Sequence, residues 1–276
     1  MIKVSIVGGS GYTGGELLRL LLFHPECTVQ QVTSERFAGK ALHRAHPNLR
    51  KASQIKFCAL AELEPCDVLF LCLPHGETAA RFETFSALAP RIIDLSADFR
   101  LSDPAVYEIW YGQPHPRPQL LERFVYGVPE INRSALKGAT HVACAGCNAT
   151  ASTLALGPLA RRNLISSVVI DVKAGSSEGG NASSEASHHP ERSGAVRSYR
   201  PTRHRHVAEI SQALGEFPIR FSATSIEMVR GILATCHVFL SSPKQEKEIW
   251  GMYREDYARE PFIRIVKERS GIHRYP

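Results

Sequence analysis

The sequence lacks several features that would place it in a special class of protein. No apolar run approaches the length of a bilayer-spanning helix, and residues 1–7 lack the apolar stretch and cleavage site of a signal peptide. The chain also has no internal repeat, no low-complexity tract and no basic stretch interleaved with aromatic residues. We therefore expect a cytoplasmic protein that acts neither in a membrane nor on nucleic acid.

The cysteines show no sign of a disulfide framework, because there are seven of them at irregular spacing. Only Cys144 and Cys147 stand at a motif-like interval. A zinc site would need two further ligands, and no second cysteine pair supports the histidine candidates. We therefore predict no metal site. The histidines that could otherwise act as zinc ligands are His188, His189, His204 and His206.

The composition that is present is that of a globular enzyme. Of the 276 residues, 43% are hydrophobic and 22% are charged, and the chain is long enough to bury one large core or two modest ones. The formal net charge of +6 predicts an anionic partner, such as a phosphorylated substrate, a dinucleotide or an acidic protein. Charge alone does not choose among them.

The first half of the chain alternates between short apolar runs and helical patterns. Such alternation predicts a parallel sheet with helices on both faces, which is an α/β architecture. The expected strands are residues 2–7, 28–33, 68–73, 92–95 and 140–143, and the expected helices are residues 16–23 and 77–88.

The second half has a different texture, with no regular helix expected between its strands. A polar stretch at residues 175–205, rich in Ser, Gly, His and Arg, predicts a long functional loop. The half as a whole predicts an α+β domain with a mixed or antiparallel sheet. Its expected strands are residues 168–173, 220–226, 233–240 and 262–266, and its expected helices are residues 149–161 and 245–259.

A glycine-rich turn follows the first strand and opens a helix. Glycine permits a tight turn and lets backbone N–H groups approach a pyrophosphate, while the helix N-terminus adds partial positive charge. The turn therefore predicts a dinucleotide site in a Rossmann-like domain, although a plain strand-to-helix turn is the simpler alternative. The expected cofactor-binding residues in it are Gly8, Ser10, Gly11, Tyr12, Thr13 and Gly14.

The end of the second expected strand indicates which dinucleotide binds. An NAD enzyme usually places a carboxylate there, but this chain has Thr33 and Ser34 first, and then Arg36, which can pair with a 2′-phosphate. These residues favour NADP(H), although the carboxylate of Glu35 is a competing ribose ligand. We expect residues 1–147 to form the NADP-binding domain and residues 148–276 the substrate domain.

Cys147 is the candidate nucleophile. It follows a strand and a glycine and begins a helix, where the dipole and the free N–H groups would stabilise a thiolate. The same N–H groups could hold an oxyanion. The alternatives are that Cys144 and Cys147 are small buried hydrophobic residues, or that they form a redox pair.

Residues 187–209 concentrate histidine and arginine. Histidine can act as an acid or base near neutral pH, and arginine can hold phosphate or carboxylate groups. Glu209 lies four residues after Arg205, so the two would pair locally on a helix. The competing interpretation is a solvated basic loop. The arginines are Arg192, Arg197, Arg200, Arg203 and Arg205.

Together these motifs resemble the N-acetyl-glutamyl-phosphate reductase family, a relative of aspartate-semialdehyde dehydrogenase. The resemblance runs through essentially the whole chain. It is strongest to the branch that acts on 2-aminoadipate 6-phosphate or glutamyl phosphate attached to a small acidic amino-group carrier protein. It rests on residues 8–14, 94–100, 145–150 and 204–206, and for the carrier-linked branch on residues 33–39, 46–50, 187–192, 199–202 and 271–276.

The resemblance implies an NADPH-dependent reductase that forms a thioester on Cys147, releases phosphate and yields a semialdehyde in lysine or arginine biosynthesis. His204 would be the acid/base residue, with His206 as the rival assignment, and Glu209 would orient a histidine. A homo-oligomer is implied too, and the positive charge suits an acidic carrier. The remaining implied contacts are Ser176 near the nicotinamide ring and Arg100, Asn148, Arg192, Tyr199 and Arg205 on the substrate.

The chain departs from the family pattern in two places. The family usually has glycine before the His-Arg-His run, where this chain has Arg203. The family also continues past Pro276, so we expect its C-terminal segment to be missing. Two other functions stay open: the N-acetyl-gamma-glutamyl-phosphate reductase of arginine biosynthesis, with a free substrate, and a non-catalytic NADP-binding module.

Overall fold

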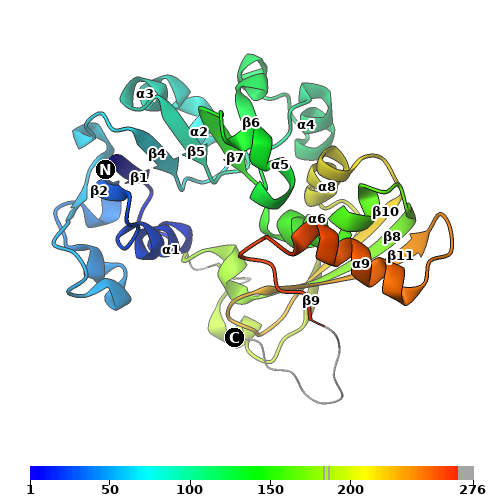
Figure 1. Ribbon diagram of the computed structural model, residues 1–276. Helices are drawn as coiled ribbons and strands as arrows, with labels where there is room; N and C mark the ends of the chain where they lie inside the picture. The colour runs from blue at the N-terminus through cyan, green and yellow to red at the C-terminus, as the bar shows by residue number, and fades with distance from the viewer. Residues whose placement is uncertain (183, 186, 267–276) are drawn as a thin grey trace.

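The protein forms two sheets, one in each domain (Figure 1), and a cleft lies between the helix that follows the first strand and the second domain. The computed structural model describes residues 1–182, 184–185 and 187–266. The residues 271–276 that contribute to the family resemblance lie outside the described part. None of the helices in the described ranges is long and apolar enough to cross a membrane.

The first sheet is entirely parallel and has the strand order β3-β2-β1-β4-β5-β7-β6. The chain runs from β1 outwards to one edge and then returns to build the other half from β4, so the switch point lies between β1 and β4. Ligands of such sheets bind at the carboxyl ends of the strands beside this point. The strands are β1 (Ile2–Val7), β2 (Cys27–Thr33), β3 (Phe57–Cys58), β4 (Val68–Leu71), β5 (Arg91–Asp94), β6 (Phe124–Gly127) and β7 (His141–Cys144).

Helices cover this sheet, as its apolar strands require. Ile6 and Leu18 are fully buried where the first helix packs on the strands, and Phe85 and Ile92 are buried in a second cluster under a later helix. The α/β prediction is confirmed. The helices are α1 (Tyr12–Leu21), α2 (Glu77–Ala80), α3 (Phe82–Leu88), α4 (Pro104–Tyr111) and α5 (Pro129–Leu136).

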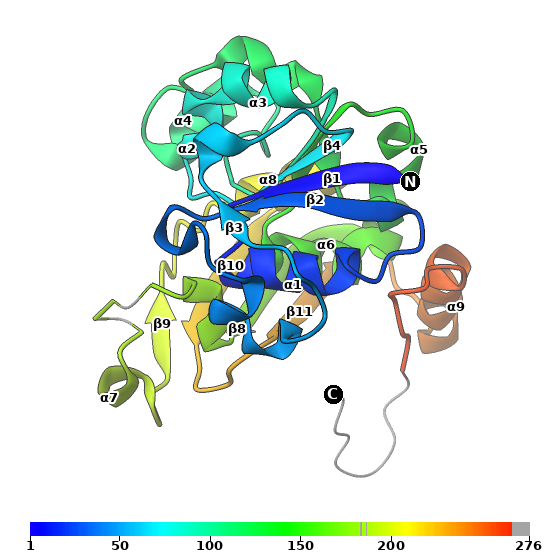
Figure 2. The same cartoon turned by 90° about the vertical axis from the view of Figure 1, so that its left-hand side faces the viewer.

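The second sheet is mixed and has the order β11-β8-β10-β9, with β8 parallel to β10 and the two outer pairs antiparallel. Two helices, α6 and α8, pack on one face of it, where Leu156 and Ile210 meet Ile170 and Phe221. Figure 2 shows the far face of β11 and β8 without a covering helix. The elements are α6 (Cys147–Ala160), β8 (Ile165–Ala174), α7 (His189–Arg192), β9 (Arg197–Tyr199), α8 (His206–Leu214), β10 (Ile219–Ser225), β11 (Ile232–Leu240) and α9 (Glu246–Tyr257).

Two expectations for the second half are wrong. A regular helix, α8, does lie between β8 and β10, because Ala208 and Ile210 provide an apolar side that the neighbouring basic residues obscure in the sequence. Residues 262–266 form no strand, since no neighbouring strand pairs with them and Phe262 is 91% exposed. Strands β3 and β6 and helices α4 and α5 were not anticipated.

Candidate active site

The glycine turn joins β1 to α1 with very little room. Gly8 has a φ of +75°, and a Cβ atom there would lie 2.4 Å from the carbonyl oxygen of Cys72 on the neighbouring strand. A Cβ atom on Gly14 would lie 2.6 Å from the Cα atom of Gly9, so α1 can approach the turn only because neither residue has a side chain. The hydroxyl of Thr33 accepts the N–H of Gly8 at 3.1 Å and anchors the turn to β2.

The N-terminus of α1 is available to an anion. Its N-cap residue is Gly11, which has no side chain to accept the first N–H groups of the helix. Tyr12 and Thr13, the next two residues, line the cleft. The structure thus brings all six predicted residues of the turn to one place, and it offers backbone donors where a pyrophosphate would bind.

The end of β2 lies beside the turn. Ser34 is buried and donates from its hydroxyl to the hydroxyl of Ser10 at 2.8 Å. Arg36 is exposed, with its guanidinium 5.2 Å from the centre of the Phe37 ring. The carboxylate of Glu35 accepts the N–H of Leu60 at 2.9 Å, so it is already engaged with protein backbone. This bond uses one of its two oxygens, so Glu35 stays the competing ribose ligand.

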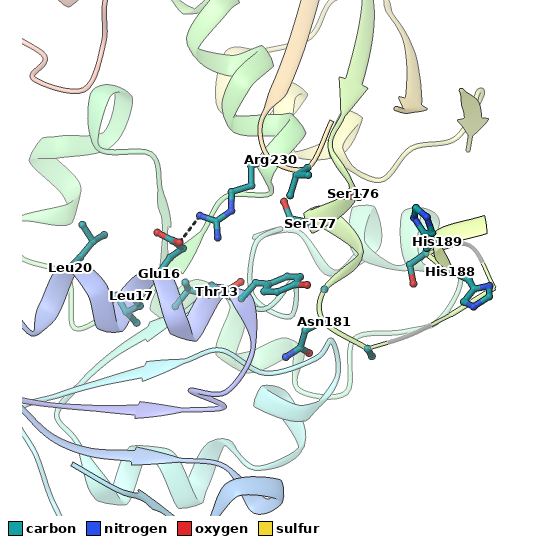
Figure 3. Close-up of a pocket in the computed structure, with 16 residues that line it drawn as sticks. Thr13, Glu16, Leu17, Leu20, Ser176, Ser177, Asn181, His188, His189 and Arg230 are labelled. Carbon is teal, nitrogen blue, oxygen red and sulfur yellow. Dashed lines mark hydrogen bonds and ion pairs between the residues drawn. The ribbon is translucent and has the colours of Figure 1, made fainter. Parts of the chain in front are cut away.

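A cleft of about 960 Å³ separates α1 from the second domain (Figure 3). Ser176 and Ser177, in the 3-10 helix Ser176–Gly179, line it opposite Tyr12 and Thr13. This volume and the donors on both walls fit a dinucleotide. Ser176 thus lines the cleft, and its place beside the nicotinamide ring stays a prediction.

Two polar contacts cross the cleft at its mouth. The side-chain amide of Asn181 donates to the carbonyl oxygen of Ser10 at 3.0 Å, and the Arg230 guanidinium lies 2.8 Å from the Glu16 carboxylate (Figure 3). Sequence reasoning did not include Asn181 or Arg230, because nothing in their local sequence indicates a contact with α1.

Cys147 is the first residue of α6 and is exposed. Its N-cap is Gly146, which again leaves the first N–H groups of the helix without a side-chain partner. Neighbouring atoms keep water from the sulfur, and this desolvation raises the pKa of the Cys147 thiol. A hydrogen bond from the backbone of Asn148 lowers the pKa, whereas the negative charge of Glu178 raises it further. Desolvation thus opposes the stabilisation of a thiolate that the open N-terminus of the helix would provide.

His204 and His206 are both buried, with their ring centres 4.5 Å apart. Burial, with nearby cationic groups, lowers the pKa of each to about 3, so both rings are neutral at physiological pH. The Nδ1 atom of His204 accepts the backbone N–H of His206 at 3.2 Å. The Nδ1 atom of His206 is buried and has no hydrogen-bond partner among the described residues.

Glu209 connects the two domains next to Gly146, the residue before the candidate nucleophile. Its buried carboxylate accepts the N–H of Gly146 at 2.7 Å and the hydroxyl of Tyr126 at 2.8 Å. It lies 3.4 Å from the Arg100 guanidinium and 3.7 Å from Nε2 of His206. Glu209 thus contacts a histidine, as the resemblance implies, and its partners come from β6, α6 and α8 and from the segment after β5.

One expected ion pair is not formed. Glu209 pairs with Arg100 rather than with Arg205, whose guanidinium lies 5.7 Å from the centre of the Tyr111 ring on α4. Arg100 has backbone partners as well. It donates to the carbonyl oxygens of Cys144 and Leu95, while Asp94 and Asp98 accept hydrogen bonds from their own loop and from α2 and its N-terminal flank.

Of the other predicted substrate residues, Tyr199 and Asn148 lie near Cys147, whereas Arg192 does not. Tyr199 donates its hydroxyl to Glu178 at 2.7 Å, and burial followed by this bond raises the pKa of Tyr199, while a hydrogen bond with Asn148 lowers it. Tyr199, Asn148 and Glu178 therefore gather around Cys147. Arg192 donates to the carbonyl oxygens of Ile226 and Ala174 instead, which ties α7 to the sheet.

Tyr126 and Glu178 are two further site residues that the sequence did not indicate. Tyr126 lies on β6, a four-residue strand with no clear sequence signal, and Glu178 directly follows the serines that the resemblance indicates. Arg203 donates to the carbonyl oxygen of Ile109 on α4, so it reaches the first domain. Among the described residues, no cluster of three His, Cys, Asp or Glu side chains could hold a metal ion.

The folds of solved enzymes agree with this arrangement. Aspartate semialdehyde dehydrogenase II of Vibrio cholerae superposes with a TM-score of 0.69 at 14% identity, over 91% of this chain and 78% of that one. The NADP complex of aspartate semialdehyde dehydrogenase from Candida albicans gives 0.65 at 15% identity, over 92% and 76%. At this identity the likeness establishes the fold.

Sequence comparison establishes the family. Residues 3–139 match the semialdehyde dehydrogenase NAD binding domain, and residues 147–274 match the semialdehyde dehydrogenase dimerisation domain. The chain belongs to the semialdehyde dehydrogenase family.

Within that family it belongs with the carrier-linked reductases, as the motifs predict. It is 52% identical to the [LysW]-L-2-aminoadipate 6-phosphate reductase of Deinococcus radiodurans, over 99% of this chain and 79% of the relative. It is 45% identical to the [LysW]-L-2-aminoadipate/[LysW]-L-glutamate phosphate reductase of Sulfurisphaera tokodaii, over 100% and 81%.

Proposed function

We propose that this protein reduces a carrier-linked acyl phosphate, 2-aminoadipate 6-phosphate or glutamyl phosphate, to the semialdehyde with NADPH. The observation that carries the proposal is an exposed cysteine at an open helix N-terminus, with the neutral ring of His206 packed against the preceding Gly146. Glu178, which raises the Cys147 pKa, directly follows Ser176 and Ser177 of the dinucleotide cleft. The names of relatives at 45% and 52% identity support the same reaction.

The first half of the reaction forms a thioester. The thiol of Cys147 passes its proton to a neutral histidine as the sulfur attacks the acyl-phosphate carbon. The free N–H groups at the start of α6 hold the oxyanion, and its collapse breaks the carbon–oxygen bond and releases phosphate. Transfer to a histidine makes the thiolate when the substrate is present, which is consistent with a raised Cys147 pKa in the free protein.

The second half yields the aldehyde. When bound in the cleft, NADPH would supply the hydride that reduces the thioester. The protonated histidine then gives its proton to the developing oxygen, and collapse of the thiohemiacetal regenerates Cys147. The family resemblance assigns this role to His204; because its Nδ1 accepts a backbone N–H, its Nε2 carries a proton that it can donate. His206, whose unpartnered Nδ1 is free to take a proton and which contacts Glu209, is the competing assignment.

The remaining roles follow from position. Backbone groups of the glycine turn would bind the pyrophosphate, Ser34 and Arg36 the 2′-phosphate, and Ser176 would lie near the nicotinamide. Asn148 and Tyr199 would contact the acyl chain. We propose Arg100, Arg192 and Arg205 as anion-binding residues, although in the free protein each guanidinium already contacts protein groups.

We propose that an acidic carrier protein presents the substrate. The net charge is +6, and Arg200 and Arg203 are exposed in the segment between Tyr199 and His204. The test is a reductase assay with carrier-linked aminoadipyl phosphate, carrier-linked glutamyl phosphate and free N-acetyl-glutamyl phosphate. We expect activity with a carrier-linked substrate that weakens as salt rises. Preference for the free substrate would identify an arginine-synthesis reductase, and binding of NADPH without turnover of any of them a non-catalytic module.

We also propose that two copies of the chain pair through the uncovered face of the second sheet. Val169, Leu233 and Phe239 are 40%, 60% and 58% exposed on β8 and β11. Their strands lie in the region that matches the family's dimerisation domain. Light scattering should show a dimer, and Phe239→Glu should shift it towards the monomer; a monomeric wild-type protein would contradict the pairing.

A further inference from the structure

His46 is a buried histidine that none of the proposed roles includes. It lies between the 3-10 helices Leu42–Arg44 and Pro47–Leu49, and only 8% of it is exposed. Its Nε2 atom lies 2.7 Å from the carbonyl oxygen of Gly9, in the middle of the glycine turn. Since a carbonyl oxygen only accepts, Nε2 carries the proton in this bond.

The imidazole ring of His46 packs tightly against the glycine turn and the start of α1. A Cβ atom on Gly15 of α1 would lie 2.6 Å from the His46 ring, so the ring occupies the space that any other residue at 15 would need. The Phe57 ring of β3 stands on another side, 6.4 Å away between ring centres. His46 thus touches both the turn and the helix that the turn opens.

The bond to Gly9 fixes the direction of a peptide group. In a planar trans peptide the C=O and the following N–H point to opposite sides. When His46 holds the Gly9 carbonyl, the N–H of Ser10 must therefore point away from His46. Ser10 borders the cleft, because its own carbonyl oxygen accepts the Asn181 amide from the opposite wall. No backbone acceptor for the Ser10 N–H occurs in the described ranges.

We propose that His46 is a positioning residue for the cofactor pyrophosphate. By donating to the Gly9 carbonyl it keeps that oxygen, which would repel a phosphate, away from the anion and keeps the Ser10 N–H available to it. The inference rests on the proposed binding of NADP(H). It differs from the usual function of a glycine turn in that a side chain from outside the motif sets the peptide orientation.

The test compares two ligands on three variants by isothermal titration calorimetry. NADPH contains the pyrophosphate, whereas 2′-adenosine monophosphate has only the part that would lie near Ser34 and Arg36. His46→Leu keeps the bulk of the side chain but removes the donor. We expect about tenfold weaker NADPH binding and 2′-adenosine monophosphate binding within twofold of wild type, because one hydrogen bond near a charged group is lost.

His46→Gln and Phe57→Leu are the matched controls. The amide of glutamine can reach the position of Nε2, so His46→Gln should bind NADPH within threefold of wild type. Phe57→Leu loosens the same packing without touching the hydrogen bond, so it should lower the melting temperature but not NADPH affinity. If His46→Leu does not fold, His46→Asn, whose amide is too short to reach Gly9, replaces it with the same expected loss.

Three results would overturn the inference: unchanged NADPH affinity in His46→Leu, an equal loss for both ligands, or an equal loss in His46→Gln. Failure of the wild-type protein to bind NADPH would refute the proposed cofactor instead. The two failures are therefore distinguishable.

Discussion

The two walls of the cleft are built in different ways. On the first wall, the glycine turn presents six consecutive or nearly consecutive residues, and its glycines pack tightly against neighbouring backbone and side chains. On the second wall, the surroundings of Cys147 are assembled by Glu209 from Gly146, Tyr126 and Arg100, which are far apart in the chain. The first wall is thus formed by neighbouring residues of one segment, whereas the second depends on the packing of the two domains.

The largest expected effect is a loss of turnover when Cys147, on the second wall, is replaced. Cys147→Ser should reduce turnover by at least about 10⁴-fold, because the hydroxyl is a far weaker nucleophile than the thiol. NADPH binding should be unchanged, since the residues proposed for the pyrophosphate and the 2′-phosphate lie on the other wall. Initial rates and fluorescence titration measure the two properties. Cys236→Ser on β11 is the control and should keep activity; a Cys147→Ser enzyme with wild-type turnover would eliminate the thioester route.

The next effect distinguishes the two histidines. His204→Asn should lower the rate by about 10²–10⁴-fold, the range for loss of a general acid or base. His206→Asn should lower it less, through the lost contact to Glu209. Single-turnover measurement of hydride transfer compares them. A larger loss in His206→Asn would transfer the acid/base role to His206.

Removal of Glu209 should cost the most stability. Glu209→Ala leaves the Arg100 cation in a site where only 10% of its side chain is exposed, and breaking such a pair costs about 3–5 kcal/mol. The matched change on the first wall is Glu16→Ala, which breaks the exposed pair with Arg230 and should cost about 0–1 kcal/mol. Urea unfolding measures both. Equal losses would contradict the contrast between the walls.

Arg36 tests the first wall without affecting the second. Arg36→Ala should weaken NADPH binding about tenfold and leave NADH binding unchanged, because only NADPH carries the 2′-phosphate. Arg44→Ala removes the same charge from another exposed position in the first domain and should have little effect on either cofactor. Equal weakening of NADPH and NADH binding by Arg36→Ala would show that Arg36 does not recognise the 2′-phosphate.

The same contrast explains what the sequence could reveal. The roles of residues 8–14 and of Cys147 can be predicted from the local sequence, because a strand, a turn and the start of a helix are adjacent in the chain. Helix α8 could not be predicted, because its apolar residues follow a run of arginines and histidines that masks the helical pattern. The partners of Glu209 could not be found at all, since Arg100 lies 109 residues away and Tyr126 83 residues away, and no local pattern encodes such contacts.

The smallest expected effect concerns the reactivity of Cys147 itself. Crowding first, and Glu178 in addition, raise the pKa of its thiol, so the rate of alkylation by iodoacetamide should climb steadily as pH rises above 7. Glu178→Gln removes a negative charge that opposes the thiolate, so it should lower the Cys147 pKa and speed alkylation about threefold at pH 7.5. Glu227→Gln, an equal charge change at an exposed residue bonded to Ser193, is the control and should leave the profile in place. A profile that Glu178→Gln does not move would mean that the crowding of the sulfur, rather than this carboxylate, keeps the thiol protonated.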